Sequence, residues 1–426
     1  MPNTLDEWLD YIGRQHSAEI VMGLDRVREV WRRMGRPKAP INIIVGGTNG
    51  KGSTCAMLES ILHIGGFKTG FYSSPHLVRY NERVRLDCTE AEDSLLTESF
   101  AAIELARTEG EVVPLTYFEF ATLSALWIFR EQQCDVAILE VGLGGRLDAV
   151  NIVDADVSVV VSVDLDHQSY LGDTREKIAI EKAHIYRQGR PAIFADTDAP
   201  QSLINHAIAI GADLCLLGRD FRYQRMDGQW QFQGRDSSRH SLPYPALRGG
   251  YQLKNASAAL GVLEALQPRL PVTQNHVKRG LLEVVWPGRM QVLPGRPAVV
   301  LDVAHNPHAA RALHDALGTM GFYQNTYAVF GMLKDKDIDA VIDIIKDRID
   351  HWFIAGLEVQ AGERGASATQ LSAKLAAHGL EGRFSMHVSI GKAFEAARER
   401  AGPDDRILAF GSFYTVAEAM KAAKAV

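Results

Sequence analysis

Short, continuously apolar segments recur along the first half of the chain and are separated by segments of helical period. Three of them contain almost no polar alternation, at residues 41–45, 135–141 and 157–163. Apolar strands of this kind are typical of a parallel sheet that helices cover on both faces. Helical patterns lie between or after them, at about 51–63, 118–132 and 173–187. The first half of the chain is therefore predicted to be an α/β structure with a mostly parallel sheet.

The pattern changes between residues 221 and 245, where aromatic, Gln, Arg and Gly residues predominate. The pair Asp227-Gly228 is a turn signal inside the segment 223–233, which favours a β-hairpin. We therefore expect a small antiparallel appendage here. Two further helical patterns follow it, at about 252–266 and 273–284.

A second break occurs where Trp286-Pro287-Gly288-Arg289 is followed by further Pro and Gly residues. A new buried strand is predicted at 298–303, and strand–helix alternation then continues through 327–331, 351–355 and 406–411. Breaks of this composition are typical of domain boundaries. We predict a first domain at 1–286, a linker at 287–296 and a second domain at 297–426.

Composition supports two domains and narrows the class of partner. The 426 residues exceed one ordinary domain, and 46% hydrophobic with 23% charged residues are typical of a globular protein. The formal net charge is −6 and no long basic run occurs, which argues against nucleic acid or an anionic membrane as a partner. The four cysteines form no CxxC pair, and no apolar run reaches the roughly 18 residues of a membrane span. We therefore expect a cytoplasmic protein.

The sharpest motif is the glycine-rich segment 46–54, which follows a predicted strand and precedes a predicted helix. In that context glycines let backbone N–H groups approach a phosphate, the helix N-terminus favours negative charge, and a lysine adds a mobile cation. The alternative is a glycine-rich turn with an incidental lysine. We predict a phosphate loop formed by Gly47, Thr48, Asn49, Gly50, Lys51, Gly52 and Ser53.

This loop departs from the standard G-x-x-x-x-G-K-[ST] pattern. Val45 occupies the position of the first glycine, and Gly52 follows the lysine in place of the hydroxyl residue that ligates Mg²⁺. The nearest hydroxyls, on Ser53 and Thr54, are displaced. A metal ion would therefore take its hydroxyl ligand from elsewhere in the chain.

Several long motifs resemble one family, the bacterial dihydrofolate synthases/folylpolyglutamate synthases of the Mur-ligase superfamily. They are GTNGKGST at 47–54, YSSPHLVRYNERVR at 72–85, LTYFEFATLSALW at 115–127, LEVGLGGRLDAVNIV at 139–153, DHQSYLG at 166–172, EKAHIYR at 181–187 and LDVAHNPHAA at 301–310. The likeness extends from about His16 to the segment 411–418. It implies an N-terminal P-loop ATPase domain, a smaller C-terminal Rossmann-like α/β domain and a site in the cleft between them.

The activity that the resemblance implies is an ATP- and Mg²⁺-dependent ligase that forms an acyl phosphate. It would add L-glutamate to dihydropteroate, giving dihydrofolate, and then to reduced folates. The resemblance further implies a monomer and a possible monovalent cation. Three alternatives stay open: a folylpolyglutamate synthase without the first activity, a cell-wall Mur ligase, and a nucleotide switch that ligates nothing. The loop begins close to the N-terminus, which leaves little room for the extra domain of a cell-wall ligase.

Candidate metal ligands follow from the same resemblance. They are Ser73, Glu140 and His167, and Glu140 also ends a predicted strand, where a carboxylate suits a crevice site. Taken alone, these residues fit a strand-end glutamate, a Ser-Ser-Pro turn and a polar loop histidine. The lysine that matches Lys182 is carbamylated in the family, so that it presents a carboxylate to a second Mg²⁺ or to the γ-phosphate. The catalytic residues implied are Lys182, Lys51 and His167.

The remaining positions are expected to contact the nucleotide or the folate. Asn255, Arg289, Asp302 and His305 resemble ATP contacts, although His305 and Asn306 also fit a polar turn before a helix starting at Asn306-Pro307. Phe118 is a candidate to stack on a pterin, and Arg83 and Arg146 are candidates to meet carboxylates or phosphates. Closure about residues 286–297 would complete the site. The substrate-binding residues implied are Ser17, Ala18, Glu19, Ile20, Thr116, Tyr117, Phe118, Glu119, Leu147, Asp148 and Ala149.

Overall fold

The computed structural model describes residues 1–16, 21–35 and 40–424. The chain forms two compact units. The first comprises residues 1–246 and 253–284, and the second comprises residues 247–252 and 285–426. The short segment 247–252 therefore packs with the second unit, although it lies inside the range expected for the first domain.

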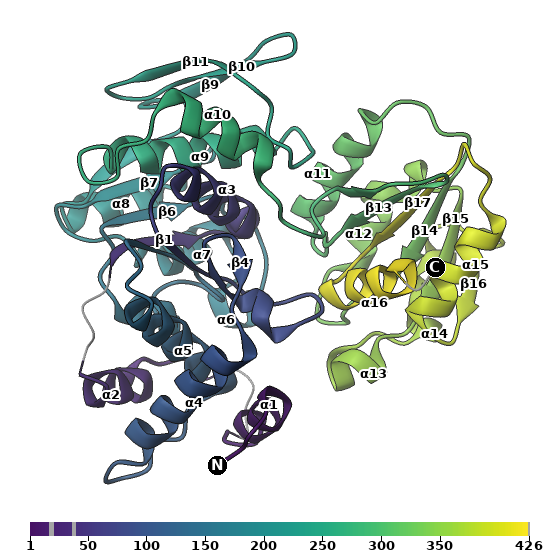
Figure 1. The fold of residues 1–426 in the computed structure, drawn as a ribbon. Helices are drawn as coiled ribbons and strands as arrows, with labels where there is room; N and C mark the ends of the chain where they lie inside the picture. Colours follow the sequence, from purple (N-terminus) through teal and green to yellow (C-terminus); the bar gives the residue numbers. More distant parts are fainter. Residues whose placement is uncertain (17–20, 36–39, 425–426) are drawn as a thin grey trace. The chain divides into compact units, whose positions relative to one another are not determined.

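An eight-stranded sheet forms the centre of the first unit, in the order β4-β3-β2-β5-β1-β6-β7-β8 (Figure 1). Two short strands, β3 (Val84–Leu86) and β4 (Thr89–Glu90), run antiparallel at one edge. The other six are parallel: β1 (Ile41–Gly46), β2 (Thr69–Tyr72), β5 (Val136–Glu140), β6 (Val157–Val160), β7 (Pro191–Phe194) and β8 (Asp213–Leu216). The prediction of a mostly parallel sheet is confirmed.

Helices cover both faces of this sheet, which explains why its strands lack polar alternation. One face carries α3 (Lys51–Ile64), α9 (Gln252–Ala265) and α10 (Gln274–Glu283). The other face carries α4 (Asp93–Thr108), α5 (Tyr117–Glu131), α7 (Arg175–Ala183) and α8 (Gln201–Ala209). Two N-terminal helices, α1 (Leu5–Gly13) and α2 (Asp25–Arg33), pack on α4 and α5 and extend the core on that side.

The predicted appendage is a three-stranded antiparallel sheet, in the order β11-β10-β9. The hairpin around Asp227-Gly228 is confirmed: β9 (Arg222–Arg225) pairs with β10 (Trp230–Gln233). A third strand, β11 (Ser238–Leu242), was not predicted from the sequence. Trp230 and Phe232 are buried on one face of this small sheet and anchor it.

The second unit has a six-stranded sheet in the order β12-β13-β17-β14-β15-β16. Residues 291–293, expected to lie in the linker, form β12 (Gln291–Leu293), which pairs antiparallel with β13 (Ala298–Asp302). The others are parallel to β13: β14 (Thr326–Phe330), β15 (His351–Ala355), β16 (Phe384–His387) and β17 (Arg406–Phe410). Helices α11 (Pro307–Gly318), α12 (Ile338–Ile345) and α14 (Ala368–Ala377) cover one face, and α15 (Ile390–Arg400) and α16 (Phe413–Lys424) cover the other.

Two elements end earlier than their patterns predicted. The apolar run 157–163 is a strand only to Val160, because Ser162 leaves the sheet to bond with the glycine-rich loop. The helix expected at 173–187 spans Arg175–Ala183. Within the described ranges, no helix is long and apolar enough to cross a membrane.

Candidate active site

The predicted phosphate loop and metal ligands of the first unit follow four neighbouring parallel strands, at the carboxyl ends of those strands. In the sheet order β2-β5-β1-β6, Ser73 follows β2, Glu140 ends β5, and the glycine-rich loop follows β1. The register pairs Val45 with Glu140, so this carboxylate lies beside the start of the loop. His167 follows β6 in the same direction. Crevices at this edge of an open parallel sheet are the usual place for a ligand.

The glycine-rich loop is held by backbone contacts to the segment after β6. The Thr48 N–H donates to the Ser162 carbonyl at 2.8 Å, and the Asn49 N–H donates to Ser162 Oγ at 3.1 Å. Gly50 has φ +89° and lies against Asn255, so that a Cβ atom there would be 2.4 Å from Asn255 Oδ1. Only glycine fits this position, and α3 begins at the next residue. This cradle fits a phosphate group, which bonds to backbone N–H groups at a helix N-terminus.

Two lysine ammonium groups meet at one carbonyl oxygen of the loop. Lys51 Nζ donates to the Gly47 carbonyl at 3.2 Å, and Lys182 Nζ donates to the same oxygen at 3.0 Å. Lys182 is only 4% exposed. Burial first, and then the nearby Lys51 cation, lower the pKa of Lys182 to about 7. Lys182 is therefore easily neutralised, unlike a solvated surface lysine.

The three expected metal ligands occupy different environments. Glu140 is 6% exposed, and Ser73 is buried with its Oγ 3.4 Å from the Glu82 carbonyl. His167 is half-buried and has φ +49° at the start of the short helix α6 (Gln168–Leu171). Among the described residues, no three His, Cys, Asp or Glu side chains form a metal cluster. One carboxylate beside a phosphate loop nonetheless fits Mg²⁺, which nucleotide sites hold through one or two carboxylates, water and the phosphates.

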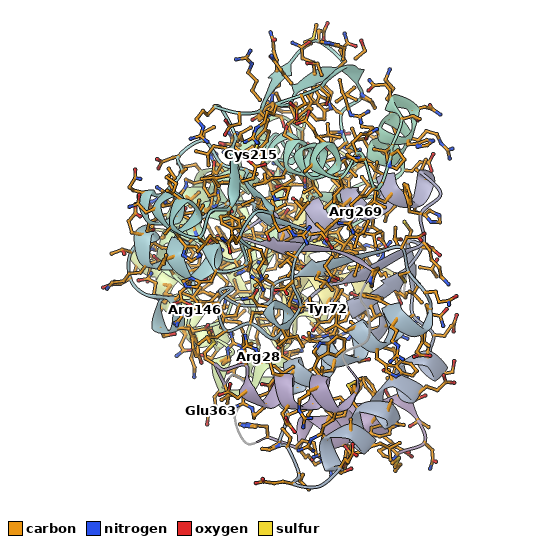
Figure 2. All side chains as sticks on the ribbon, turned by 90° about the vertical axis from the view of Figure 1, so that its left-hand side faces the viewer. Arg28, Tyr72, Arg146, Cys215, Arg269 and Glu363 are labelled. Carbon is orange, nitrogen blue, oxygen red and sulfur yellow. The ribbon has the colours of Figure 1, made fainter. Side chains whose placement is uncertain are left out.

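Two aromatic side chains pack together on the β2 and β5 side of the same edge. Phe118, in the first turn of α5, packs so closely on Gly142 that a Cβ atom there would be 2.6 Å from Phe118 Cζ. The Tyr72 ring centroid is 6.1 Å from that of Phe118, and Tyr72 is fully buried (Figure 2). A half-buried Phe118 with a buried tyrosine behind it can offer a face to a flat aromatic ring.

The loop from Leu143 to Ala149 follows Gly142, on which Phe118 packs. Asp148 Oδ2 accepts the Leu143 N–H and Oδ1 accepts the Val150 N–H, both at 2.9 Å. Burial raises the pKa of Asp148 to about 6. Ala149 is buried at the start of the 3₁₀ turn Ala149–Ile152, and Leu147 is half-buried. The Asp148 carboxylate therefore holds the loop in shape by binding two of its backbone N–H groups. The sequence did not predict this structural role.

Glu119 is a structural anchor in this conformation. Its carboxylate accepts the Thr116 N–H at 2.8 Å, and Thr116 Oγ1 accepts the Glu119 N–H, which caps α5 immediately beside Tyr117 and Phe118. The Arg26 Nη2 atom also donates to Glu119 Oε1 at 2.9 Å and to the Val21 carbonyl at 3.2 Å. Arg26 had no signal in the sequence. The expected substrate residues Ser17, Ala18, Glu19 and Ile20 lie outside the described residues.

Arg146 differs from its expected role. Its guanidinium pairs with Glu181, with Nη2 2.8 Å from Oε1, and its side chain is 47% exposed (Figure 2). The pair ties the loop 143–149 to α7, because the Arg146 N–H also donates to the Glu181 carbonyl. In this structure Arg146 is therefore engaged with the protein's own carboxylate.

The second unit brings its three expected residues together at the end of β13. Asp302 accepts the N–H groups of Met290 and Ala304, both at 2.8 Å, and burial raises its pKa. The Arg289 guanidinium lies 5.1 Å from the centre of the Phe413 ring, and the His305 ring lies 6.2 Å from it. Both side chains therefore lie next to Phe413, the first residue of α16, which was not predicted from the sequence as a site residue. Asn306 caps α11, as its turn pattern also allowed.

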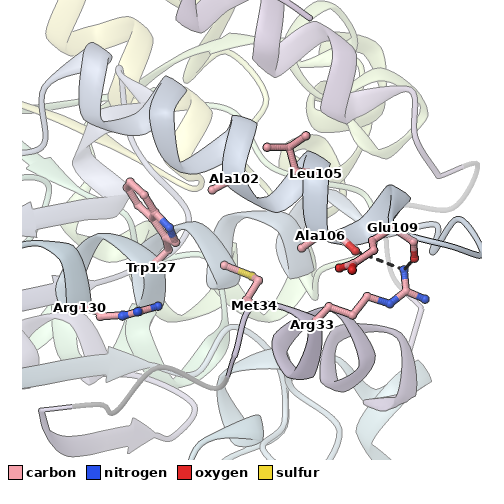
Figure 3. A pocket seen from close by; sticks show the side chains of 8 residues that line it. All are labelled: Arg33, Met34, Ala102, Leu105, Ala106, Glu109, Trp127 and Arg130. Atoms are coloured by element: carbon pink, nitrogen blue, oxygen red, sulfur yellow. Dashed lines mark hydrogen bonds between the residues drawn. The ribbon is translucent and has the colours of Figure 1, made fainter.

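A separate hollow of about 360 Å³ lies at the opposite end of α5 (Figure 3). Its lining includes Trp127 and Arg130, which lie roughly 13 to 18 Å along the helix from Phe118 at 1.5 Å per residue. The full lining is Arg33, Met34, Ala102, Leu105, Ala106, Glu109, Trp127 and Arg130. None of the expected site residues is among them, so this hollow is distinct from the candidate active site.

The fold and this edge define a phosphate-loop ATPase unit joined in one chain to a second α/β unit, the architecture of Mur ligases. The family model "Mur ligase middle domain" matches residues 45–263, and "Mur ligase, glutamate ligase domain" matches residues 288–413. The chain belongs to the dihydrofolate synthase/folylpolyglutamate synthase family within that class. It is 45% identical over 418 residues to the dihydrofolate synthase/folylpolyglutamate synthase of Escherichia coli (strain K12), covering 98% of this chain and 95% of that protein.

Two solved structures extend the comparison. "E.coli FolC in complex with DHPP and ADP" has a TM-score of 0.93 at 44% identity, covering 100% of this chain and 99% of that one. A "bifunctional folylpolyglutamate synthase/dihydrofolate synthase with Mn, AMPPNP and L-Glutamate bound" has a TM-score of 0.90 at 42% identity, covering 99% and 98%. Family members therefore accept a nucleotide, a divalent metal, an amino acid and DHPP on this fold.

Proposed function

We propose that the protein is an ATP-dependent acid–amino-acid ligase that adds L-glutamate to dihydropteroate and to reduced folates. The observation that carries the proposal is the adjacency of two sites on one sheet edge. Strands β1 and β5 are neighbours, so the glycine-rich loop after β1 lies beside the segment after β5, where Phe118 packs on Gly142. Such an arrangement suits the transfer of a phosphoryl group to a carboxylate on an aromatic substrate.

The proposed reaction has two steps. A carboxylate oxygen of dihydropteroate attacks the γ-phosphorus of ATP and expels ADP, which gives an acyl phosphate. The glutamate amine then attacks the acyl carbon, loses a proton and expels inorganic phosphate, which leaves an amide. Neither step needs a protein nucleophile, so the residues act by positioning and by neutralising charge.

The residues have separable roles in this scheme. Gly50, Gly52 and Ser53 would bind phosphates through N–H groups at the start of α3, and Lys51 would add positive charge. Gly47, Thr48 and Asn49 would line the phosphates, with the Thr48 and Asn49 N–H groups fixed to Ser162. Ser73, Glu140 and His167 would hold Mg²⁺, which supplies neutralisation of phosphate charge when bound. Asn255, Arg289, Asp302 and His305 would contact the nucleotide. Thr116, Phe118, Leu147, Asp148 and Ala149 would form the pterin pocket.

Carbamylation of Lys182 would resolve a conflict that the geometry creates. Two ammonium groups that share the Gly47 carbonyl repel each other. The neutral Lys182 amine attacks the carbon of CO₂ and loses one proton to solvent, which gives a carbamate anion that Lys51 would attract. The low pKa of Lys182 supplies the neutral amine that this reaction needs. We propose that the active enzyme carries this carbamate.

Both activities, and not tail extension alone, fit the comparisons. The two relatives most useful here carry both activities in their printed names, and one structure holds DHPP. The alternative of a folylpolyglutamate synthase without the first activity has no structural observation in its favour. The unpaired cysteines fit a reducing compartment, so we propose a cytoplasmic location and, by the family resemblance, a monomer.

An ADP-release assay tests the proposal. The purified protein is given ATP, Mg²⁺, dihydropteroate and L-glutamate, and each component is omitted in turn. We expect ADP release to require all of them and mass spectrometry to find dihydrofolate. Turnover only with folates that already carry glutamate would remove the first activity. ATP hydrolysis that ignores both organic substrates would contradict the ligase.

A further inference from the structure

Arg83 is a buried cation near the proposed pterin pocket. It ends the 3₁₀ turn Tyr80–Arg83 and is 9% exposed. Its guanidinium carbon lies 5.6 Å from the centre of the Tyr80 ring and 5.4 Å from that of Tyr117. Its Nε donates to His76 Nδ1 at 2.8 Å, which leaves the two terminal nitrogens without a hydrogen bond to any described residue. A guanidinium held this rigidly has lost the mobility of an ordinary surface arginine.

Arg83 also has no carboxylate partner among the residues that the structure describes. The adjacent Glu82 carboxylate is occupied by three backbone N–H groups, those of Leu77, Val78 and Arg79, at 2.6–2.7 Å. His76 cannot supply a negative charge, and burial together with the Arg83 cation lowers its pKa to about 4. Among the described residues, the positive charge of Arg83 is therefore stabilised by the faces of the Tyr80 and Tyr117 rings, which are weaker partners for a cation than a carboxylate.

Two other arginines of the first unit, the buried Arg107 and the half-buried Arg85, have carboxylate partners. Arg107 bonds to both oxygens of Glu104, at 2.6 and 2.7 Å, and Arg85 Nε lies 3.1 Å from Glu59 Oε2. In the second unit, Arg406 lacks a carboxylate partner among the described residues but donates to Thr326 Oγ1 and the Leu317 carbonyl. Arg83 differs from all three because its two terminal nitrogens make no hydrogen bond to a described residue.

The location connects this fork to the reaction. The Ser73 N–H donates to the Arg83 carbonyl at 2.9 Å, so Arg83 is directly bonded to the residue expected to hold the metal. Tyr117, which stacks against the guanidinium, precedes Phe118 in α5. Arg83 thus lies between the phosphate-transfer edge and the pterin-stacking residue.

We propose that Arg83 is a preformed receptor for a substrate carboxylate. A guanidinium fork matches a carboxylate in a bidentate geometry, and the buried cation gains the anionic partner that it lacks. The inference rests on the proposed function, which offers two sources of that carboxylate. One is the carboxylate of dihydropteroate that is phosphorylated, and the other is the α-carboxylate of glutamate.

The test uses Arg83→Gln and Arg83→Lys in the full-length protein, with Arg79→Gln as the matched control. Arg79 lies on the same segment but is 60% exposed and pairs with Glu90 and Asp93. Michaelis constants for dihydropteroate, glutamate and ATP are measured, and so is the melting temperature. Binding of dihydropteroate is compared with that of its analogue lacking the carboxyl group, by calorimetry without ATP.

We expect both Arg83 variants to raise the Michaelis constant of one carboxylate substrate by at least roughly 10-fold, with that of ATP unchanged, because lysine cannot reproduce the bidentate fork. If dihydropteroate is the source, the wild type will prefer it to the decarboxylated analogue and Arg83→Gln will not. If glutamate is the source, only the glutamate constant will rise.

Unchanged constants for both acids in a folded Arg83→Gln or Arg83→Lys protein would overturn the proposal. An equal rise in the Arg79→Gln control would overturn it as well. Absence of turnover in the wild type would contradict the proposed function itself, which keeps the two failures distinct.

Discussion

The phosphate-loop side and the pterin-pocket side of the proposed site are built in different ways. The loop is a run of consecutive residues whose glycines and helix N-terminus form a cradle that fits a phosphate group, and hydrogen bonds to Ser162 fix it to the segment after β6. The pocket is assembled from side chains that are far apart in sequence. Arg26 bonds to Glu119 across 93 residues, and Phe118 packs on Gly142.

Because the two sides are built differently, substitutions on each side should change different kinetic constants. A change in the loop should remove catalysis outright, because Lys51 and the N–H groups at the start of α3 are proposed to bind the same phosphates. A change in the pocket should act through the position of α5, and should therefore raise a Michaelis constant more than it lowers a maximal rate. The predictions below run from the loop to the outer edge of the pocket.

The largest effect is expected at Lys51. Lys51→Ala should lower ADP release by roughly 10²–10³-fold or more, because a preorganised cation is lost from the transferring phosphate. Steady-state ADP release measures it, with Lys177→Ala as the control, since Lys177 is 63% exposed and pairs with Asp173. A Lys51→Ala protein with near-normal turnover would show that the loop is a structural turn.

Lys182 should give the clearest pH dependence. Carbamylation needs a neutral amine, so activity should rise with pH through about 7 and with added bicarbonate. Lys182→Met should lower turnover by roughly 10²-fold. Intact mass under mild conditions should show one added CO₂. A bare lysine at alkaline pH with bicarbonate, in a fully active protein, would contradict this proposal.

The stability of the uncarbamylated protein should follow the same pKa. The folded protein loses the Lys182 proton near pH 7, whereas the unfolded chain keeps it to about pH 10.4. The unfolded state then binds more protons between these values, so the free energy of unfolding rises with pH, by up to about 1.4 kcal/mol per pH unit. Urea unfolding in CO₂-free buffer measures the slope, and the Lys182→Met protein should lack this contribution.

A smaller effect is expected at the Arg26–Glu119 pair. Glu119→Gln keeps the cap of α5, since glutamine also serves at that position, but it removes the ion pair. Both Glu119→Gln and Arg26→Gln should raise the Michaelis constant for dihydropteroate by roughly 3–10-fold, which corresponds to about 1 kcal/mol for a partly exposed pair. The double variant should be no worse than either single one. Additive losses would mean that the two residues act separately.

The smallest effect is expected at Arg146. Because its guanidinium is paired with Glu181 at the surface, Arg146→Gln should change stability by less than about 1 kcal/mol and turnover by less than about 2-fold. Thermal unfolding and ADP release measure both. A large rise in a substrate Michaelis constant would return Arg146 to the substrate site, as its sequence context first indicated.

The same contrast explains how far the sequence could be interpreted. Periodicity located β1, β5, β13 and the α/β class, because buried strands and covering helices leave local patterns. It also located the loop, whose residues are consecutive. It did not identify Arg26, Phe413 or the third strand of the appendage. Those depend on contacts between distant segments, and a single arginine or phenylalanine carries no local signal of its partner.

Glycine-rich and polar segments were harder to place for a related reason. The run 157–163 is apolar throughout, yet its last residues leave the sheet to hold the loop. Residues 291–293 follow a Pro-Gly break and still form β12, because β13 offers a free edge to pair with. Asp148 is predicted to lie at the substrate, and no sequence pattern indicated that its carboxylate also holds two backbone N–H groups. These three features depend on hydrogen bonds to other residues, which the composition of a short stretch of sequence does not indicate.

The transfer of oxygen from the substrate carboxylate to phosphate is the most direct test of the central claim, which is that the ligase forms an acyl phosphate. Dihydropteroate labelled with ¹⁸O in its carboxylate is incubated with the protein, ATP, Mg²⁺ and L-glutamate, and the released phosphate is analysed by mass. An acyl phosphate requires that one carboxylate oxygen leave with phosphate, so each amide formed should yield one labelled phosphate. Amide formation with unlabelled phosphate would contradict the proposed ligase mechanism.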